Sequence, residues 1–446
     1  MILLKDNPNL LSDRLSNGLM ALPFYRTAIL DKENYIDKPL GIHIKKRILS
    51  SFSFLKYPKR LCFPQTKIVV FSSTLFDIKD GDHFFNQLHG FYKKAFPNDT
   101  TVIEDCDIYG NWRRPNQDGD ISYCHTMIMC ICRIFAIFMS RIKGINNASL
   151  DNIISTYPLL STRQLAYDNY LGTSSYWIYK RIFRRRKTKL IVLNCASYGG
   201  TFAAITRAAH ECGITVVETQ HGMINDIHYV YNVESFVYNS EEYKKYLPDY
   251  LLTFGQFWNE HSYIPVNKYI IGNPYLDFYK RFNSFNKENN TTNKTIVLFI
   301  SQPDVIVQFL PIALQLSSYS QYEIVFRLHP FDNLTKEMEE QLSSKGVKIS
   351  YSSISLYDDI LHSSVVIGGN STCLYEAMGL GRPVLVFSNV DTIEMYKDKK
   401  YLLFNNFEEL LMKLESGVTI ENVEAEYYYA GNFNEKYNNF INSIWK

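Results

Sequence analysis

The chain has 446 residues, which is too long for one ordinary hydrophobic core and predicts two domains of roughly 150–250 residues each. With 46% hydrophobic and 21% charged residues, the composition is that of a soluble globular protein and excludes disordered, collagen-like and coiled-coil classes. The formal net charge of +2 gives no global signal for nucleic-acid binding.

Cysteine usage and apolar runs favour a cytoplasmic protein. The eight cysteines form no C-x-x-C pair, and Cys130 and Cys132 have the wrong spacing for a zinc site. We find no secretory signal, so we expect a reduced cytoplasmic protein with no metal site. The most apolar helix candidate, residues 126–139, is about 14 residues long and contains Arg133. That length favours a buried or partly membrane-facing helix over a transmembrane one.

The first half of the chain alternates short apolar runs with helical patterns. Strands are predicted at 67–72, 188–194, 214–219, 249–255 and 269–272, with helices at 82–94 and 202–212. Asn273-Pro274 is taken as a turn, and the polar stretch 282–294 as an exposed loop or linker.

The second half restarts the same pattern. Strands are predicted at 295–300, 323–328, 347–350, 365–368 and 383–387, with helices at 305–317, 356–363 and 371–378 and a helical tail at 421–446. The predicted fold class is therefore α/β, with two Rossmann-like doubly wound domains. The predicted domains are 1–262 for the acceptor, 263–420 for the donor, and the tail 421–446.

Polar residues follow two predicted strands of the second half. Arg327 ends one strand, and His329-Pro330 comes directly after it. Pro330 restricts His329 toward an extended conformation, and an imidazole held there can donate a hydrogen bond to a phosphate. Ligands of open parallel sheets bind beyond the carboxyl ends of the strands.

A second group lies between the strand 365–368 and the next helix. Gly369 and Asn370 allow close approach of the backbone to a ligand, and Ser371 and Thr372 begin the helix, whose free N–H groups attract anions. Glu376, one turn later, is placed to accept hydrogen bonds from both hydroxyls of a ribose. Together these residues predict a phosphate and ribose site.

The segment from His329-Pro330 through Ser371-Thr372 to Glu376 and Arg382-Pro383 resembles the donor half of GT-B glycosyltransferases of bacterial surface polysaccharide biosynthesis. It is similar to the sialyl and Kdo transferases with an HP motif and to the teichoic-acid glycerophosphate polymerases. The resemblance covers residues 295 to about 415. It implies that the His and the hydroxyls hold the donor's phosphate, that the domains face each other across a cleft, and that the C-terminal helix packs back on the N-terminal domain.

In the first half, Gln220-His221-Gly222 follows a predicted strand, as a comparable turn does in the same families. The resemblance implies that His221 is the base that takes the acceptor's proton, with His228 a second candidate. A carboxylate base is the alternative: Asp80 lies in a Lys-Asp-Gly-Asp segment that loosely resembles the acidic motif of sialyltransferases. Asp80-Gly81 is also an ordinary turn, with Asp82 as a helix cap.

A dense basic run, 180–189, contains Arg184, Arg185 and Arg186. It suits the anionic inner leaflet, where a lipid-linked saccharide acceptor is found, and predicts a peripheral membrane protein. The predicted partners are a nucleotide-sugar donor and this acceptor, with no nucleic acid, no cofactor and no required metal. The alternatives are an alditol-phosphate transferase with a CDP-linked donor, a nucleotide-sugar 2-epimerase, and a non-catalytic saccharide-binding protein. The sugar, the nucleotide, the acceptor and the stereochemistry stay open.

Overall fold

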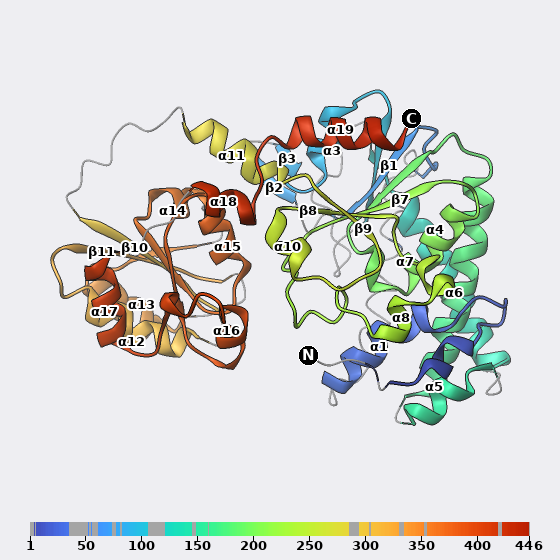
Figure 1. Cartoon of the computed structure of the whole chain (residues 1–446), viewed down its shortest axis with the longest axis horizontal. Coiled ribbons are helices and arrows are strands. Elements are labelled where there is room, and N and C mark those ends of the chain that lie inside the picture. The colour runs from blue at the N-terminus through green and yellow to red at the C-terminus, as the bar shows by residue number, and fades with distance from the viewer. Residues whose placement is uncertain are drawn as a thin grey trace. The chain divides into compact units, whose positions relative to one another are not determined.

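The computed structural model describes the chain except for residues 1–3, 5, 35–51, 53–54, 56–60, 74–76, 81–82, 106–120, 145–148, 159, 285–293, 303–304, 330–333, 352–354, 418–421 and 446. The chain divides into two compact units (Figure 1). Unit 1 comprises residues 1–253, 261–270 and 437–446, and unit 2 comprises residues 254–260 and 271–436. The polypeptide passes from one unit to the other four times, and the predicted boundary at 262/263 falls among the first three passages.

Unit 1 is built on a parallel sheet with the strand order β5-β4-β1-β6-β7-β8-β9. The strands are β1 (Ile68–Ser73), β4 (Thr100–Asp105), β5 (Ile121–Ser122), β6 (Leu190–Leu193), β7 (Thr215–Thr219), β8 (Tyr250–Thr253) and β9 (Asn267–Ile270). β6 is buried along its whole length, as expected for a parallel strand covered on both faces.

The helices of unit 1 cover this sheet (Figure 1). They are η1 (Pro8–Ser12), α1 (Leu22–Asn34), α3 (Gly90–Ala95), α4 (Cys124–Ile142), α5 (Asp151–Thr156), α6 (Thr162–Phe183), η6 (Ala196–Tyr198), α7 (Thr201–His210), α8 (Ser235–Tyr238), α9 (Glu241–Lys244) and the greater part of α19 (Phe433–Ile444). In α19, the Tyr437 ring lies 4.7 Å from that of Tyr92, and the Phe440 ring lies 5.2 Å from that of Tyr250. The prediction that the C-terminal helix packs on the N-terminal domain is confirmed.

Unit 2 is built on a second parallel sheet with the order β12-β11-β10-β13-β14-β15. Its strands are β10 (Thr295–Ile300), β11 (Tyr322–Arg327), β12 (Lys348–Ser350), β13 (Val365–Gly368), β14 (Val384–Phe387) and β15 (Leu403–Phe404). Its helical elements are α10 (Gln256–Glu260), α11 (Pro274–Ser284), α12 (Ile306–Leu316), α13 (Lys336–Ser344), α14 (Leu356–His362), α15 (Thr372–Gly379), α16 (Val390–Met395), η7 (Lys400–Leu402), α17 (Phe407–Ser416) and α18 (Asn422–Tyr428). Two α/β units with parallel sheets confirm the predicted fold class.

Each sheet has one point where the strand order changes direction. In unit 1 the chain runs outward from β1 to β4 and β5, and then from β6 to β9 on the other side. In unit 2 it runs from β10 to β12, and then from β13 to β15. The loops that leave adjacent strands at such a switch point go to opposite faces of the sheet and leave a crevice at the carboxyl edge. The β1/β6 and β10/β13 edges are therefore the places to look for ligands.

The predicted helix at 82–94 is wrong in its first half. The chain instead forms an antiparallel hairpin of β2 (Asp77–Asp80) and β3 (His83–Asn86), followed by α3. Asn86 ends the strand because its side-chain oxygen accepts hydrogen bonds from the backbone N–H of Leu88 at 3.2 Å and of His89 at 2.7 Å. Helical geometry starts only after this turn. The predicted cap Asp82 lies outside the described residues.

Asn273-Pro274 begins a helix rather than a turn. The Asn273 side chain accepts a hydrogen bond from the backbone N–H of Tyr275 at 3.0 Å, and Pro274 occupies the first position of α11, where a missing N–H costs nothing. α11 also takes the first three residues of the polar stretch 282–294.

α4 is longer than predicted, with 19 residues instead of about 14. Among the described residues, it is the one helix long and apolar enough to cross a membrane by length and composition, and a third of its most apolar window is buried.

Candidate functional site

The loop between β13 and α15 lies at the switch point of unit 2. Ser371 is the N-cap of α15, and its hydroxyl accepts a hydrogen bond from the backbone N–H of Cys373 at 3.3 Å. A Cβ at Gly368 would lie 2.9 Å from Leu374 Cδ2, and one at Gly369 would lie 3.1 Å from Val305 Cγ1. The glycines therefore let the loop pack tightly in front of the helix, whose first N–H groups form the positive end of its dipole.

Gln302 holds this loop from the neighbouring strand, and the sequence analysis did not single it out. It follows β10, and its side-chain Nε2 donates a hydrogen bond to the carbonyl oxygen of Asn370 at 2.6 Å. Its Oε1 is buried and accepts no hydrogen bond from any residue that the structure describes. The Ser-Gln-Pro sequence after a buried strand was the available signal.

His329 follows β11, on the other side of β10. Its backbone N–H donates to the Ser301 hydroxyl at 3.4 Å, and its side chain is partly exposed. β11, β10 and β13 are consecutive neighbours, so His329, Gln302 and Asn370 lie along one carboxyl edge. At about 4.8 Å per strand, the outer two backbones are about 10 Å apart, a span that a phosphate and its ribose can bridge. Pro330 lies outside the described residues.

Arg327 is bound within unit 2. Its guanidinium donates to Asp359 Oδ2 at 2.5 Å and to the Ser350 hydroxyl at 3.2 Å. The two charged side chains are 11% and 13% exposed, so this ion pair fixes α14 to β11. Its predicted role at the donor stays a prediction.

Glu376 lies on α15, one turn after Thr372. Burial raises the pKa of its carboxyl to about 7, and a hydrogen bond from Tyr357 acts in the opposite direction. The carboxyl is therefore divided between its neutral and charged forms at neutral pH. Hydrogen bonds donated by two hydroxyls of a ribose would favour the carboxylate.

α15 is braced from behind by aromatic side chains of the same unit. A Cβ at Gly379 would lie 2.5 Å from the Tyr429 ring, so this position admits only glycine against that side chain. The Tyr375 ring stacks on the Tyr396 ring at 5.5 Å, and Trp258 Nε1 donates to the Tyr428 carbonyl at 2.6 Å. This packing fixes the helix whose N-terminus forms the candidate anion site.

The carboxyl edge of unit 1 carries three histidines, of which two were singled out from the sequence. His221 follows β7, and its Nε2 lies 3.8 Å from Cys195 Sγ. Burial lowers its pKa to about 4, the neighbouring His228 adds to the effect, and hydrogen bonds with the backbone of Asn194 and Thr219 oppose it. The imidazole is therefore neutral at pH 7 and able to accept a proton, although its pKa is further below neutral than expected.

His89 is the histidine that the sequence analysis missed. It is fully buried, its Nδ1 lies 2.9 Å from the Ser72 hydroxyl, and its Nε2 lies 3.1 Å from the Thr219 hydroxyl. Burial lowers its pKa to about 3, with a further contribution from His221. A neutral ring thus connects the ends of β1 and β7 beside His221.

Glu218 is a buried carboxyl beneath this edge. It accepts hydrogen bonds from the Ser197 backbone N–H and the Tyr231 hydroxyl, both at 2.9 Å, and from the Ser197 hydroxyl. Burial raises its pKa to about 7 in spite of these bonds. The residue pattern of β7 did not predict that Glu218, a charged residue, would be fully buried.

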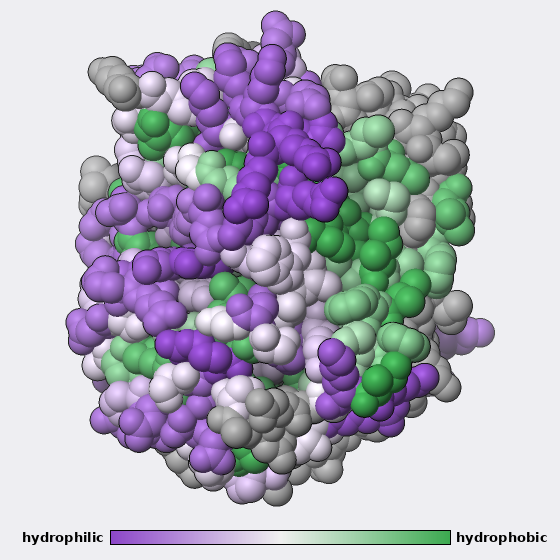
Figure 2. All heavy atoms as spheres, turned by 90° about the vertical axis from the view of Figure 1, so that its right-hand side faces the viewer, coloured by the Kyte–Doolittle hydropathy of each residue, from purple (hydrophilic) through white to green (hydrophobic). Residues whose placement is uncertain are grey.

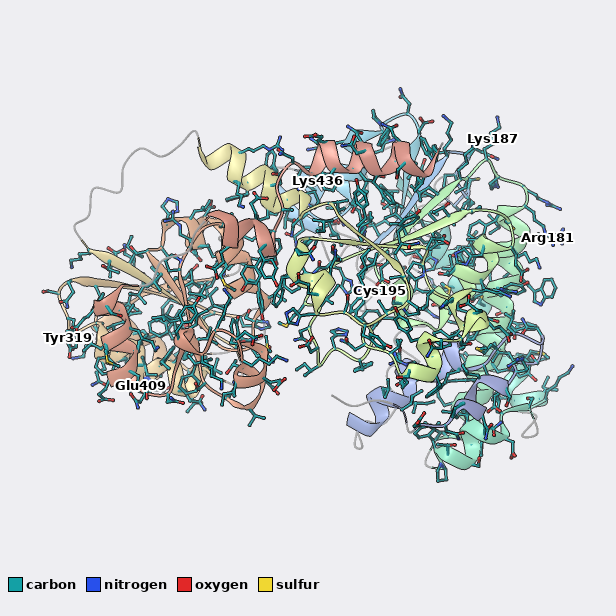
Figure 3. The ribbon with its side chains drawn as sticks, viewed as in Figure 1. Arg181, Lys187, Cys195, Tyr319, Glu409 and Lys436 are labelled. Atoms are coloured by element: carbon teal, nitrogen blue, oxygen red, sulfur yellow. The ribbon has the colours of Figure 1, made fainter. Side chains whose placement is uncertain are left out.

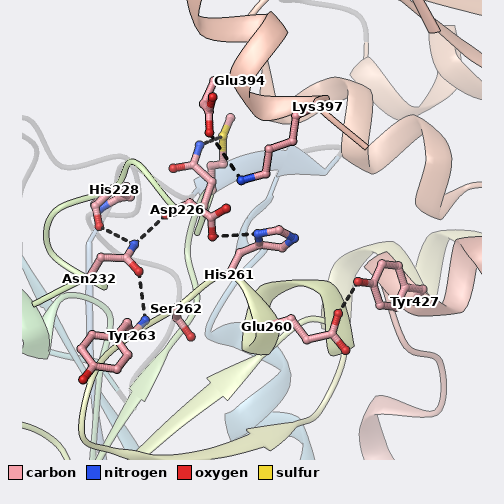
Figure 4. A network of polar contacts seen from close by, with 12 residues as sticks. Asp226, His228, Asn232, Glu260, His261, Ser262, Tyr263, Glu394, Lys397 and Tyr427 are labelled. Carbon is pink, nitrogen blue, oxygen red and sulfur yellow. Dashed lines mark hydrogen bonds and ion pairs between the residues drawn. The ribbon is translucent and has the colours of Figure 1, made fainter. Parts of the chain in front are cut away.

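The loop after β7 carries His228 and is held by its own polar contacts (Figure 4). His228 Nε2 lies 3.3 Å from the Tyr198 hydroxyl, and the Tyr198 ring lies 5.6 Å from the His221 ring. Asn232 Nδ2 donates to the His228 carbonyl at 3.1 Å, and the His261 ring pairs with Asp226 at 2.8 Å (Figure 4). The loop thus keeps His228 and Tyr198 close to His221.

The remaining predicted residues lie elsewhere in unit 1. Asp80 is the last residue of β2, and its backbone lies opposite that of His83 in the register of the hairpin. Arg184 and Arg185 are exposed at the end of α6, and Arg186 is partly buried. Among the described residues, no group of three or more His, Cys, Asp and Glu side chains is placed to hold a metal ion.

The sequence matches no protein-family model and no curated protein. Among solved structures, the chain is similar to the UDP-GlcNAc 2-epimerase of Methanocaldococcus jannaschii, with a TM-score of 0.48, 12% identity, and coverage of 85% of this chain and 100% of the other. For the UDP-GlcNAc 2-epimerase of Neisseria meningitidis, the TM-score is 0.43 and the sequence identity 13%, and the match covers 85% of this chain and 100% of the other. For the wall teichoic acid polymerase TagF, the TM-score is 0.40 and the sequence identity 14%, and the match covers 94% of this chain and 97% of the other. Similarity at this level assigns neither a family nor a substrate.

Proposed function

We propose that the chain is a glycosyltransferase that moves a sugar from a nucleotide-sugar donor to a lipid-linked or growing surface polysaccharide of the O-antigen or capsule type. The observation that carries the proposal is the edge of unit 2 at its switch point. There the Gln302–Asn370 hydrogen bond fixes a loop in front of the N-terminus of α15. Glu376 follows on the same helix.

The donor's phosphate binds at the start of α15. The N–H groups of its first turn and the Ser371 and Thr372 hydroxyls supply donors, and the helix dipole favours an anion there. His329 supports the phosphate from β11, and Glu376 accepts from the ribose hydroxyls. When the bond to the sugar breaks, the same groups stabilise the charge that develops on the leaving phosphate, without need of a metal ion or a cofactor.

The acceptor hydroxyl loses its proton to a base of unit 1. His221 is our first candidate because its imidazole, with a pKa lowered to about 4, is neutral at pH 7 and can accept a proton from a hydroxyl held next to it. Asp80 is the carboxylate alternative. Arg184, Arg185 and Arg186 are proposed to face the acceptor's lipid at the inner side of the cell membrane.

Calorimetric titration with CMP, UDP, GDP and CDP tests the donor site. The strongest binder of the four identifies the nucleotide, and we expect His329→Ala and Ser371→Ala to abolish measurable binding of it. Ser317→Ala and His362→Ala are matched controls, because Ser317 caps the opposite end of α12 and His362 is exposed at the end of α14. Unchanged affinity in both site variants would refute the donor site.

A donor screen separates the proposal from its rivals. Interconversion of a nucleotide sugar without any acceptor would identify a 2-epimerase. Release of CMP from a CDP-linked alditol would identify an alditol-phosphate transferase. Saccharide binding without nucleotide and without turnover would identify a binding protein.

A further inference from the structure

Helix α4 exposes a row of large hydrophobic side chains. Ile131, Ile134, Phe135, Phe138 and Ile142 are between 43% and 62% exposed. They stand three, four, seven and eleven residues after Ile131, which places them on one face of a helix. Scattered exposed hydrophobic residues are ordinary, but a continuous helical face of five marks an interaction surface. We call these five residues the α4 face.

The opposite side of α4 belongs to the core of unit 1. Cys124, Ile128 and Cys132 are buried in the main hydrophobic cluster. His125 Nδ1 lies 2.5 Å from the Tyr179 hydroxyl of α6, which fixes the N-terminal end of α4 against the C-terminal end of α6. A helix anchored in this way along one side cannot leave the unit to span a bilayer. The α4 face can therefore contact another molecule or a membrane only while α4 stays packed on unit 1.

Basic residues lie at both ends of the α4 face. Arg141 and Lys143 are exposed at its C-terminal end. At the other end, α6 presents Trp177 and Arg181, and Arg184 is its C-cap residue; all three are exposed. Arg185 and Lys187 follow, also exposed. Residues 121–150 include no Asp or Glu. The surface therefore combines an apolar centre with cationic ends.

Figure 2 shows this side of the molecule, with a continuous hydrophobic area next to a strongly hydrophilic one. Figure 3 shows the Arg181 and Lys187 side chains pointing away from the ribbon on the same side. Apolar side chains and cations are thus presented to the same surroundings, as in helices that lie in the plane of a membrane interface.

We propose that unit 1 docks onto an anionic lipid bilayer through the α4 face, with α4 parallel to the membrane plane. Ile134, Phe135 and Phe138 enter the boundary between head groups and acyl chains, and Arg181, Arg184 and Lys143 contact the anionic head groups. The indole of Trp177 suits the same depth, because its ring is apolar and its N–H is polar.

The charges favour a bilayer over a second copy of the chain. Two copies joined through their α4 faces would bring their cationic ends together, and like charges across an interface oppose binding. An anionic bilayer neutralises the same cations. The proposal rests on the proposed membrane-side acceptor, but it concerns lipid binding alone and involves neither donor nor transfer.

The test is flotation of the full chain with vesicles of phosphatidylcholine alone or with 30% phosphatidylglycerol. We expect binding to the anionic vesicles, falling with added salt. The double variant Ile134→Ser with Phe138→Ser should lose affinity by on the order of 100-fold, because two large side chains no longer leave water. Arg181→Gln and Arg184→Gln should each lose about fivefold on anionic vesicles only.

Met412→Ser is the matched control, because Met412 is 61% exposed on α17 of unit 2 and its loss should leave vesicle binding unchanged. All substituted side chains are exposed, so an unchanged melting temperature is expected and verifies the fold. Brominated lipids should quench the fluorescence of Trp177, and the quenching should disappear in Trp177→Phe.

Equal vesicle binding of wild type and the Ile134→Ser, Phe138→Ser variant would overturn the proposal. A wild-type dimer that becomes monomeric in this variant and does not float with vesicles would overturn it as well, in favour of a second copy. Neither result depends on nucleotide binding, so failure here is distinguishable from failure of the proposed donor site.

Discussion

The edge of unit 2 at the β10/β13 switch point is lined by backbone groups, hydroxyls, one carboxyl and one histidine, His329, whereas the edge of unit 1 at β1/β6 collects three histidines, His89, His221 and His228, above the buried Glu218. Both edges arise from the same strand order. The first is suited to hold an anion and the second to move a proton. The comparison teaches that a shared topology supplies the position of a site, while the residues that follow the strands supply its chemistry.

The strongest way to break this comparison is His221→Asn. If unit 1 handles the proton, we expect the turnover rate to fall by about 10²–10⁴-fold, because the general base is lost. Release of nucleotide from the donor found in the screen, in the presence of a membrane extract as acceptor source, measures the rate.

Nucleotide affinity should stay at the wild-type value in this variant. His210→Asn is the control, because His210 lies at the far end of α7, where it pairs with Asp249 at 3.1 Å. A wild-type rate in His221→Asn would move the base to Asp80 or to another group.

Glu376→Gln tests whether unit 2 binds the ribose through a carboxylate. Without ligand, the pKa of the Glu376 carboxyl is about 7. In the wild type the affinity should therefore fall up to tenfold for each pH unit below 7, as the carboxylate takes up a proton. The variant should bind more weakly at pH 8 and should not show this additional loss.

The ratio of the two affinities, measured by calorimetry at pH 6, 7 and 8, removes the titration of the nucleotide itself. A ratio that does not change with pH would contradict a ribose contact through the Glu376 carboxylate.

Gln302→Ala sharpens the claim that unit 2 binds through an ordered loop. Loss of the hydrogen bond to the Asn370 carbonyl should weaken nucleotide binding about fivefold, because a typical hydrogen bond contributes about 1 kcal/mol. Gln315→Ala, at an exposed position of α12, should bind as the wild type does. Equal affinities in both variants would show that the loop does not need this bond.

The last test concerns stability rather than function. Glu218 has a pKa of about 7 in the folded chain against an ordinary value of 4.5, so the folded state holds its proton more tightly. Its stabilising contribution is present below pH 4.5 and is lost between pH 4.5 and 7, at about 1.4 kcal/mol per pH unit.

In urea unfolding between pH 5 and 7, the slope of Glu218→Gln should be smaller than that of the wild type by about 1.4 kcal/mol per pH unit, because Glu376 still contributes in both proteins. Glu340→Gln, an exposed change on α13, should keep the wild-type slope. A common slope in wild type and Glu218→Gln would mean that Glu218 is not the buried titrating group.

The sequence was sufficient for most of the parallel strands, because runs such as Leu190–Leu193 are apolar throughout and include β-branched residues, but β4, β5 and β15 were not predicted. It was sufficient for the start of α15, because Gly369, Asn370 and Ser371 combine loop and cap preferences. It was insufficient where one side-chain contact determines whether a segment is a strand, a helix or a turn. The Asn86 turn and the Asn273 cap each depend on side-chain bonds that no periodicity reveals.

The same limit applies to the candidate site. His89 lies 130 residues from its partner Thr219, and Gln302 lies 68 residues from Asn370, so only the folded sheets bring these groups together. His221 and Ser371 were found because each directly follows a strand. The depressed pKa of His221 was not foreseeable, because it depends on burial and on His228.

The division of unit 1 into three segments has a consequence for synthesis on the ribosome. Residues 437–446 complete this unit, where Tyr437 contacts Tyr92 and Phe440 contacts Tyr250. Domains generally fold in order of their translation. Here the sheet of unit 1 is translated first, but α19, which packs on it, is translated last. The nascent N-terminal half therefore exposes apolar surface until unit 2 has been made.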